Sequence, residues 1–339
     1  MRYVGDPSVK VSDIEAAARR LNGVVHHTPL KRSRTLDDLL SGHIHLKLEN
    51  LQRTGSYKIR GAYNKIALLS EDAKKRGVIA ASAGNHAQGL AYAARQFAIA
   101  CTIVMPETAP RTKIQATTSY GARVVLHGKS YDDAYAHARM LADTEGMTYV
   151  HAFDDPDVIA GQGTVALEIY EDLPTVTTVI VPIGGGGLIS GVATYLKAKN
   201  PSIRIIGVQA KGAPSTALSL KHGMRTVVDE IYTLADGIAV KCPGALTFEI
   251  MRALVDTVWT VSEERIVEAM GILLEREKML VEGAGAIALA GLLDHPEVAH
   301  AEEVALIVSG GNIDLSRLST LFAAPYEKTP EEPLKLGES

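Results

Sequence analysis

Short apolar runs rich in β-branched residues alternate with helical patterns along most of the chain. Several of these runs are apolar at nearly every position, which is typical of strands covered on both faces. The predicted strands are Ile44–Leu48, Val78–Ala81, Cys101–Met105, Arg123–Leu126, Thr178–Pro182, Ile203–Val208, Thr257–Val261 and Val304–Val308. Their alternation with helices predicts an α/β protein with mainly parallel sheets.

Two helix starts can be read from capping residues. Ser262 is followed by Glu263 and Glu264, and the apolar positions after them keep to one face of a helix. Residues 130–133 (Ser-Tyr-Asp-Asp) are close to a capping box and predict a second helix start.

Composition and charge exclude several classes of protein. The chain has 339 residues, enough for one large domain or two, with ordinary fractions of hydrophobic (46%) and charged (22%) residues. The net charge of −4 indicates no nucleic-acid partner, and no apolar run is long enough to cross a membrane. Cys101 and Cys242 form no disulfide framework, which indicates a cytoplasmic location.

The sequence Gly184-Gly185-Gly186-Gly187-Leu188 follows a predicted strand and precedes a helix expected from about Ile189. Glycines let backbone amides approach an anion, and a helix start attracts negative charge. A dinucleotide loop would need glycine where Ile189 stands, and the lysine of a Walker loop is absent. We therefore predict a site for a single terminal phosphate; the alternative is a flexible turn.

Lys58 lies in a glycine-containing loop, Thr54–Ala62, that runs into a helical pattern. The helix dipole disfavours a cation there, which lowers the pKa of the amine and makes it a better nucleophile. The alternative is an ordinary solvated surface lysine.

Two further loops follow predicted strands. Ser82–Gly89 opens a helix for which Ser82 is a candidate N-cap, a purely structural role. The same small residues, with Asn85 and His86, also predict a pocket for a carboxylate and a phenolic oxygen. Residues 309–312 (Ser-Gly-Gly-Asn) follow the last strand and read by default as a tight turn.

These four loops, in this order, resemble the serine/threonine dehydratase (threonine ammonia-lyase) family, which are pyridoxal 5′-phosphate (PLP) enzymes of the tryptophan-synthase-β-like fold, or fold type II. The motifs Ser56–Ala62 and Ser82–Gly89 are the characteristic ones. Weaker matches are Ala235–Val240 and Glu282–Ala286. The similarity covers roughly residues 10 to 322.

The resemblance implies PLP as the cofactor and a role for each matching residue. Lys58 would hold PLP as a Schiff base and later move the Cα proton. Residues 184–188 would hold the phosphate, Asn85 the ring oxygen and Ser309 the pyridine nitrogen. Gly237 would be a position of close approach to the cofactor. The substrate carboxylate would be bound by Ser82, Ala83, Gly84, Asn85 and His86.

The resemblance also implies an organisation. Two open, twisted, mainly parallel sheets with helices on both faces would form a larger domain (1–72 and 149–325) and a smaller one (73–148). The cofactor would lie in the cleft between them, and residues 326–339 would form a mobile tail. The family forms homodimers or homotetramers.

The implied reaction is β-elimination of water from L-threonine, L-serine or both, which gives 2-oxobutanoate or pyruvate and ammonia. A neutral Ser309, in place of a carboxylate, would favour elimination over transamination. The alternatives are a racemase of the serine type, a dehydratase of another β-hydroxy amino acid, and a nucleotide- or phosphate-binding module without PLP.

Three positions bear on the racemase alternative. Related racemases place a serine hydroxyl opposite the lysine, and here Ala83 occupies that position, which predicts elimination. Those racemases also bind a divalent metal through acidic residues, and the matching positions here are Gln209 and Ser215. We therefore predict no divalent metal at this place; the alternative is a monovalent cation bound by backbone carbonyls.

Overall fold

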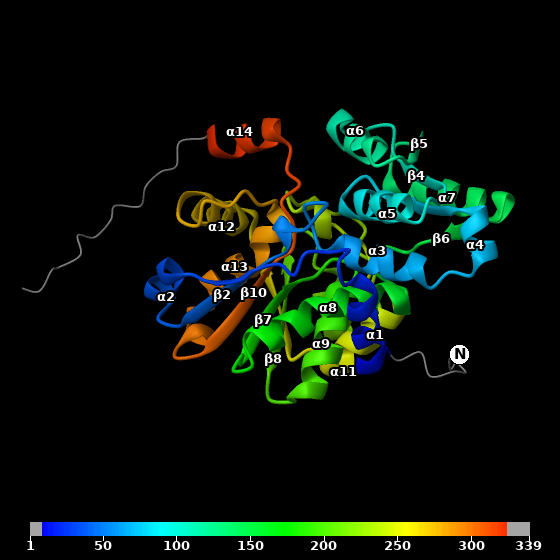
Figure 1. Ribbon diagram of the computed structural model, residues 1–339. Helices are drawn as coiled ribbons and strands as arrows, with labels where there is room; N and C mark the ends of the chain where they lie inside the picture. Colours follow the sequence, from blue (N-terminus) through cyan, green and yellow to red (C-terminus); the bar gives the residue numbers. More distant parts are fainter. Residues whose placement is uncertain (1–8, 324–339) are drawn as a thin grey trace, which may run out of the picture.

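The computed structural model describes residues 9–323, which form two sheets covered by helices (Figure 1). In spatial order the larger sheet contains β1 (Leu30–Arg32), β2 (His43–Leu48), β10 (Glu303–Val308), β7 (Thr178–Pro182), β8 (Arg204–Ala210) and β9 (Thr257–Val261). The smaller sheet contains β5 (Arg123–Leu126), β4 (Cys101–Met105), β3 (Val78–Ala81) and β6 (Thr148–Tyr149). Every pairing is parallel except that of β1 with β2.

The predicted α/β architecture with mainly parallel sheets is therefore confirmed, and each of the eight predicted strands is present. The strand predicted at Ile203–Val208 runs from Arg204 to Ala210 instead. The sequence patterns missed β1 and β6, which have three and two residues and are too short for a hydrophobic pattern to show.

The helices connect these strands. Their bounds are α1 Val11–Leu21, α2 Arg34–Leu40, α3 Lys58–Ala67, α4 Glu71–Arg76, α5 Asn85–Gln96, α6 Arg111–Ser119, α7 Tyr131–Glu145, α8 Pro156–Asp172, α9 Gly187–Lys199, α10 Ser215–His222, α11 Ala245–Leu254, α12 Glu263–Glu275, α13 Gly283–Asp294 and α14 Leu315–Ala323. Short 3-10 turns are η1 Glu49–Leu51, η2 Asp236–Ile238 and η3 Pro296–Ala299.

Both predicted helix starts are confirmed. The Ser262 hydroxyl accepts a hydrogen bond from the Arg265 amide at the start of α12. Ser130 and Asp133 form a complete capping box at the start of α7. Each cap satisfies amide groups that the first helical turn leaves without partners.

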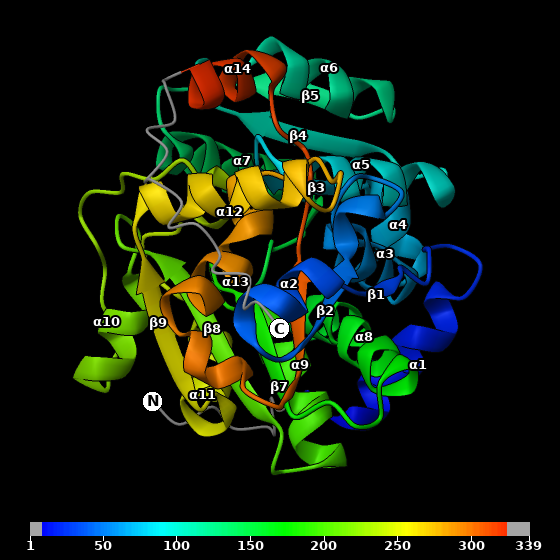
Figure 2. The same cartoon turned by 90° about the vertical axis from the view of Figure 1, so that its left-hand side faces the viewer.

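Helices cover both faces of each sheet (Figure 2). Side chains of α1, α8, α9 and α11 pack on one face of the larger sheet, and those of α2, α12 and α13 pack on the other. The smaller sheet has α3 and α5 on one face and α7 on the other. The central strands β3, β4, β7, β8 and β10 are thus buried on both sides, which explains their nearly continuous apolar sequences.

The smaller sheet uses residues Val78 to Tyr149. The domain division at residues 73–148 stays a prediction, and the predicted tail, 326–339, lies outside the described residues. Within residues 9–323, no helix is long and apolar enough to cross a membrane.

Candidate active site

Lys58 is the first residue of α3, and the loop before it is tied to the loop that follows β10. The Tyr57 amide donates a hydrogen bond to the Ser309 carbonyl at 3.2 Å. The Lys58 amine, Nζ, donates to the Ala152 carbonyl at 3.1 Å. Segments from the beginning, middle and end of the chain therefore meet at this lysine.

The tetraglycine loop connects β7 to α9, which begins at Gly187 and not near Ile189 as predicted. Gly186 has a φ angle of +96°, in the left-handed region that residues with a Cβ rarely adopt. A Cβ on Gly185 would lie 2.3 Å from the ring of Phe153. Glycine is thus required here for backbone conformation and for close packing, and not only for flexibility.

The amides of this loop are free to bind a ligand. Within the described residues, the N–H groups of residues 184 to 188 donate no hydrogen bond. The loop is nevertheless held in place, because the Thr247 hydroxyl donates to the Gly185 carbonyl at 2.6 Å. Free amides at a helix N-terminus form the kind of site that binds a phosphate group.

Gly237 lies in η2, between the glycine loop and the start of α13. A Cβ on Gly184 would lie 3.1 Å from the Cα of Ile238, so η2 runs directly beside the loop. A Cβ on Gly237 would lie 3.1 Å from that of Ala284. The weaker motif around Gly237 therefore reflects a tight contact next to the predicted phosphate site.

The start of α5 differs from the expectation for Ser82. The N-cap residue is Gly84, and the Ser82 hydroxyl accepts a hydrogen bond from the Gly84 amide at 3.2 Å. The prediction that Ser82 is the N-cap was therefore wrong, because the helix begins three residues later, at Asn85. Within the described chain the amides of residues 85 to 87 donate no hydrogen bond, so the start of α5 is a second candidate anion site.

His86 is buried and held by the backbone. Its Nε2 lies 3.0 Å from the Val150 carbonyl, which can only accept, so Nε2 carries the proton. Burial, aided by the charge of Lys58, lowers the pKa of His86 to about 3, and the ring is neutral. Its Nδ1 can then only accept, so His86 could serve a carboxylate through its backbone amide but not through its ring.

Asn85 is held between two side chains. Its Nδ2 donates to Glu282 Oε1 at 2.5 Å, and its Oδ1 accepts from Asn312 Nδ2 at 2.8 Å. Glu282 precedes α13, and its amide donates to the Gly310 carbonyl at 3.2 Å. Asn85, which is predicted to hold the ring oxygen, is thus oriented by Glu282 and Asn312. Both of these residues lie in loops that connect elements of the larger sheet.

Ser309 is buried beside the start of α13. Its hydroxyl donates to the Ala284 carbonyl at 3.0 Å. A Cβ on Gly285 would lie 2.2 Å from the Gly310 carbonyl oxygen, so the loop after β10 rests directly on this helix. The glycines of the weaker Glu282–Ala286 motif allow that contact.

Two ionisable groups of this region, Lys58 and Glu282, have pKa values shifted in the direction that favours their neutral forms. Burial lowers the pKa of Lys58 to about 8, and the charge of Glu282 only partly opposes it. Burial and the negative charge of Asp236 raise the pKa of Glu282 to about 7, against the opposing effects of Asn85, Lys113 and Lys58. Lys58 is therefore able to act as a neutral amine near neutral pH.

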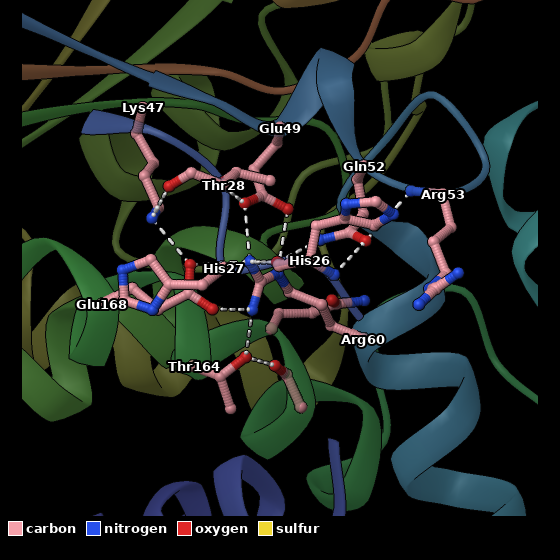
Figure 3. A network of polar contacts seen from close by, with 12 residues as sticks. His26, His27, Thr28, Lys47, Glu49, Gln52, Arg53, Arg60, Thr164 and Glu168 are labelled. Atoms are coloured by element: carbon pink, nitrogen blue, oxygen red, sulfur yellow. Dashed lines mark hydrogen bonds and ion pairs between the residues drawn. The ribbon is translucent and has the colours of Figure 1, made fainter. Parts of the chain in front are cut away.

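A fully paired charge network surrounds Arg60, two residues after Lys58 in the sequence (Figure 3). Arg60, in the first turn of α3, donates to Glu49 at 2.8 and 2.9 Å and to Glu168 at 2.6 and 2.9 Å. The buried Lys47 amine lies 2.6 Å from Glu168. This network anchors the turn that carries Lys58 to η1 and α8.

Gln209 and Ser215, at the positions considered for a metal, have other surroundings in the structure. Gln209 accepts hydrogen bonds from the Thr216 and Ala217 amides at 3.0 and 2.9 Å, so it caps α10. The Ser215 hydroxyl is buried and has no hydrogen-bond partner within the described residues. No cluster of His, Cys, Asp and Glu able to hold a metal occurs in that part of the chain.

Comparison with known proteins now identifies the family. The model of the pyridoxal-phosphate dependent enzymes matches residues 21–310. The chain belongs to this family. It is 52% identical to an L-threonine ammonia-lyase of Thermotoga maritima, over 93% of this chain and 78% of that protein.

Two solved structures of the same fold show how close the alternatives are. Maize serine racemase has a TM-score of 0.89 and 37% identity, over 92% of this chain and 96% of its own. The processed threonine deaminase isoform 2 of Solanum lycopersicum also has a TM-score of 0.89, with 39% identity over 95% and 91% of the two chains. The predicted family, fold and cofactor are confirmed, and the fold alone does not separate dehydratase from racemase.

The residues present fit PLP. A phosphate would be held by the free amides of residues 184–188, and the partly buried amine of Lys58 would form the covalent link. Asn85 has an N–H to offer the ring oxygen, since Glu282 takes only one of the two on Nδ2. Ser309 would meet the ring nitrogen.

Four residues of this site were missed by the sequence patterns. Glu282 stood inside a weak motif and Asn312 ended another, but neither was singled out. Phe153 gave no local signal, because the glycine loop that it contacts is distant in the sequence. A charged residue inside the Lys58 motif, Arg60, could have suggested a buried ion pair.

Proposed function

We propose that the enzyme eliminates water from L-threonine, L-serine or both, and releases 2-oxobutanoate or pyruvate with ammonia. The observation that carries the proposal is the position of Lys58. Its amine has a pKa of about 8 and stands at the start of α3. The 52% identity to an L-threonine ammonia-lyase supports the choice of substrate.

Each part of the site would have one task. The amides at the start of α9 bind the cofactor's phosphate, and those at the start of α5 bind the substrate carboxylate. PLP, when bound, supplies the electron sink for the pair left at Cα. Lys58 takes the Cα proton and holds it on Nζ. The β-hydroxyl needs a proton to leave as water, and a phosphate group held at the start of α9 would be the nearby acid that supplies it.

Ser309 would keep the ring nitrogen beside a neutral group. Its hydroxyl is engaged with Ala284, so it places no negative charge there. We expect Ser309→Asp to lower elimination and to allow side reactions such as transamination, because a carboxylate would keep the nitrogen protonated. Product analysis by mass spectrometry measures this; unchanged rates and products would contradict the role.

A racemase is the second candidate, and the likeness to maize serine racemase favours it. Racemisation needs a proton donor on the face of Cα opposite Lys58. Ala83 has no transferable proton, and the adjacent Ser82 hydroxyl accepts from the Gly84 amide. We therefore expect L-serine to give pyruvate with little D-serine, measured by chiral chromatography. D-serine forming as fast as pyruvate would overturn the assignment.

The anchoring lysine can be tested directly. Borohydride reduction of the yellow holoenzyme should fix a phosphopyridoxyl group on the peptide that contains Lys58. Peptide mapping by mass spectrometry measures it, and a label on any other lysine would refute the site assignment.

We also propose the domain division at residues 73–148, a cytoplasmic location and a homodimer or homotetramer. The two sheets support the division. The free thiols of Cys101 and Cys242 suit a reducing compartment. Analytical ultracentrifugation measures the assembly, and a monomer would contradict it.

A further inference from the structure

Glu282 is a buried carboxyl group that the proposed reaction does not use. It is 5% exposed and precedes α13. Its Oε1 accepts the hydrogen bond from Asn85 Nδ2. A Cβ on Gly310 would lie 2.4 Å from that oxygen and 3.1 Å from Asn85 Nδ2, so the chain packs tightly around this one hydrogen bond.

The orientation of each amide in this group follows from the chemistry of its partners. Asn312 Nδ2 donates to the Thr54 carbonyl at 2.8 Å, and a carbonyl can only accept. The nitrogen of Asn312 must therefore face Thr54. The same nitrogen also lies 2.8 Å from Asn85, so the atom of Asn85 facing it must be the oxygen.

The orientation of Asn85 then determines what it can offer. Because its oxygen faces Asn312, its nitrogen faces Glu282, which accepts one N–H. The second N–H has no acceptor among the described residues and is left for a ligand. If the amide were turned over, an oxygen would face the ligand and the carboxylate, and both contacts would become repulsive.

We propose that Glu282 and Asn312 are positioning residues that hold the Asn85 amide with its free N–H towards the ring oxygen of PLP. This rests on the proposed role of Asn85. The Thr54 carbonyl fixes the nitrogen of Asn312, and this nitrogen requires the oxygen of the Asn85 amide to face it. Glu282 then accepts a hydrogen bond from the nitrogen of the same amide. Glu282 can accept this hydrogen bond through Oε1 both when it is ionised and when it is protonated on its other oxygen.

The test compares holoenzyme spectra and PLP affinities of substituted proteins. A hydrogen bond to the ring oxygen stabilises its ionised form, so its loss should shift the visible absorption band. Glu282→Leu and Asn312→Leu should each shift the band as Asn85→Ala does, and each should weaken PLP binding about tenfold, the value of one hydrogen bond to a charged group. Glu282→Gln should keep the wild-type spectrum, because its amide oxygen can still accept.

Two control variants, Glu277→Leu and Asn85→Ala, separate the possible failures. Glu277→Leu removes another buried carboxyl, one that pairs with Lys31 and Ser33, and should lower the melting temperature without changing the spectrum. If Asn85→Ala itself changes neither spectrum nor affinity, the proposed site assignment fails. If Asn85→Ala shifts the band but Glu282→Leu and Asn312→Leu do not, the positioning inference alone fails.

A double substitution gives the sharpest outcome. In Asn85→Ala/Glu282→Leu the spectrum and PLP affinity should equal those of Asn85→Ala alone, since Glu282 acts only through that amide. Additive losses would overturn the inference. A spectral change in Glu282→Gln as large as that in Glu282→Leu would overturn it too, because the charge and not the acceptor would then matter.

Discussion

Two groups of buried charges include residues of the first turn of α3, and their pKa values shift in opposite ways. In the network of Arg60, burial alone would lower the pKa of Arg60, but Glu49 and Glu168 raise it above its usual value. Burial alone would raise the pKa of Glu49, and Arg60 and Lys47 bring it below its usual value. These groups stay charged because each has close partners.

Around Lys58 the partners are fewer and burial prevails. The pKa of Lys58 falls to about 8 and that of Glu282 rises to about 7. Lys58 and Arg60 are two residues apart in the sequence, yet their pKa values shift in opposite directions. The paired guanidinium of Arg60 anchors the turn, whereas the amine of Lys58 has fewer charged partners and is available for chemistry. Both groups of side chains are buried, so burial does not distinguish them. The number of close charged partners decides which side chains stay ionised and which shift towards their neutral forms.

Removing the reactive charge should have the largest effect. We expect Lys58→Ala to fold and to lose turnover by ~10³-fold or more, because one residue supplies both the covalent link and the proton transfer. Steady-state assays of 2-oxo acid release measure it. Lys65→Ala, on the same helix but paired with Asp155 and Asp157, serves as the control and should retain most activity. Wild-type turnover in Lys58→Ala would mean that another lysine is the anchor.

Removing the structural charge should act on folding. Arg60→Met would leave Glu49 and Glu168 buried without their main partner, at a cost of about 3–5 kcal/mol in the free energy of unfolding. Urea denaturation measures this. Arg265→Met breaks the partly exposed pairs with Glu268 and Asp294 and should cost less than about 1 kcal/mol. Equal losses in the two variants would contradict the comparison.

Glu282 should make stability depend on pH. Its pKa is about 7 in the folded protein and 4.5 in the unfolded chain, so between these values the folded state binds more protons. Its contribution is fully present below pH 4.5 and is lost as pH rises towards 7, by about 1–3 kcal/mol. Urea denaturation of wild type and Glu282→Gln at saturating PLP should show the wild type losing stability relative to the variant over this range. Parallel pH profiles would show that the carboxyl is not buried as described.

The smallest effect is expected at a position with no charge. Ala83→Ser adds a hydroxyl in the loop before α5 and should raise the ratio of D-serine to pyruvate slightly, since it provides a proton source that Ala83 lacks. Chiral chromatography of an L-serine incubation measures the ratio. Ala87→Ser, within the buried face of α5, is the matched control. An equal rise in both variants would argue against a specific role for position 83.

Local sequence was enough for the strands and for the loops that carry the predicted chemistry. Most of the strands joined by the seven parallel pairings are rich in apolar residues, so their burial on both faces could be predicted from the sequence alone. The glycine loop and the Lys58 loop were also readable, because glycine runs and a lysine at a helix start are unusual in themselves. The sequence did not predict the short strands β1 and β6 or the N-cap at Gly84, because short elements and loop geometry leave little pattern in the sequence.

The sequence by itself determined the α/β class, the two candidate anion sites and Lys58 as the candidate reactive amine. Only the tertiary structure decided which residues surround them: Phe153 against the glycine loop, Asn312 and Glu282 on Asn85, and Glu49 and Glu168 on Arg60. Glycine loops and helix starts are local features of the backbone. Pairing and desolvation depend on which distant segments meet, and no short window of sequence contains both partners.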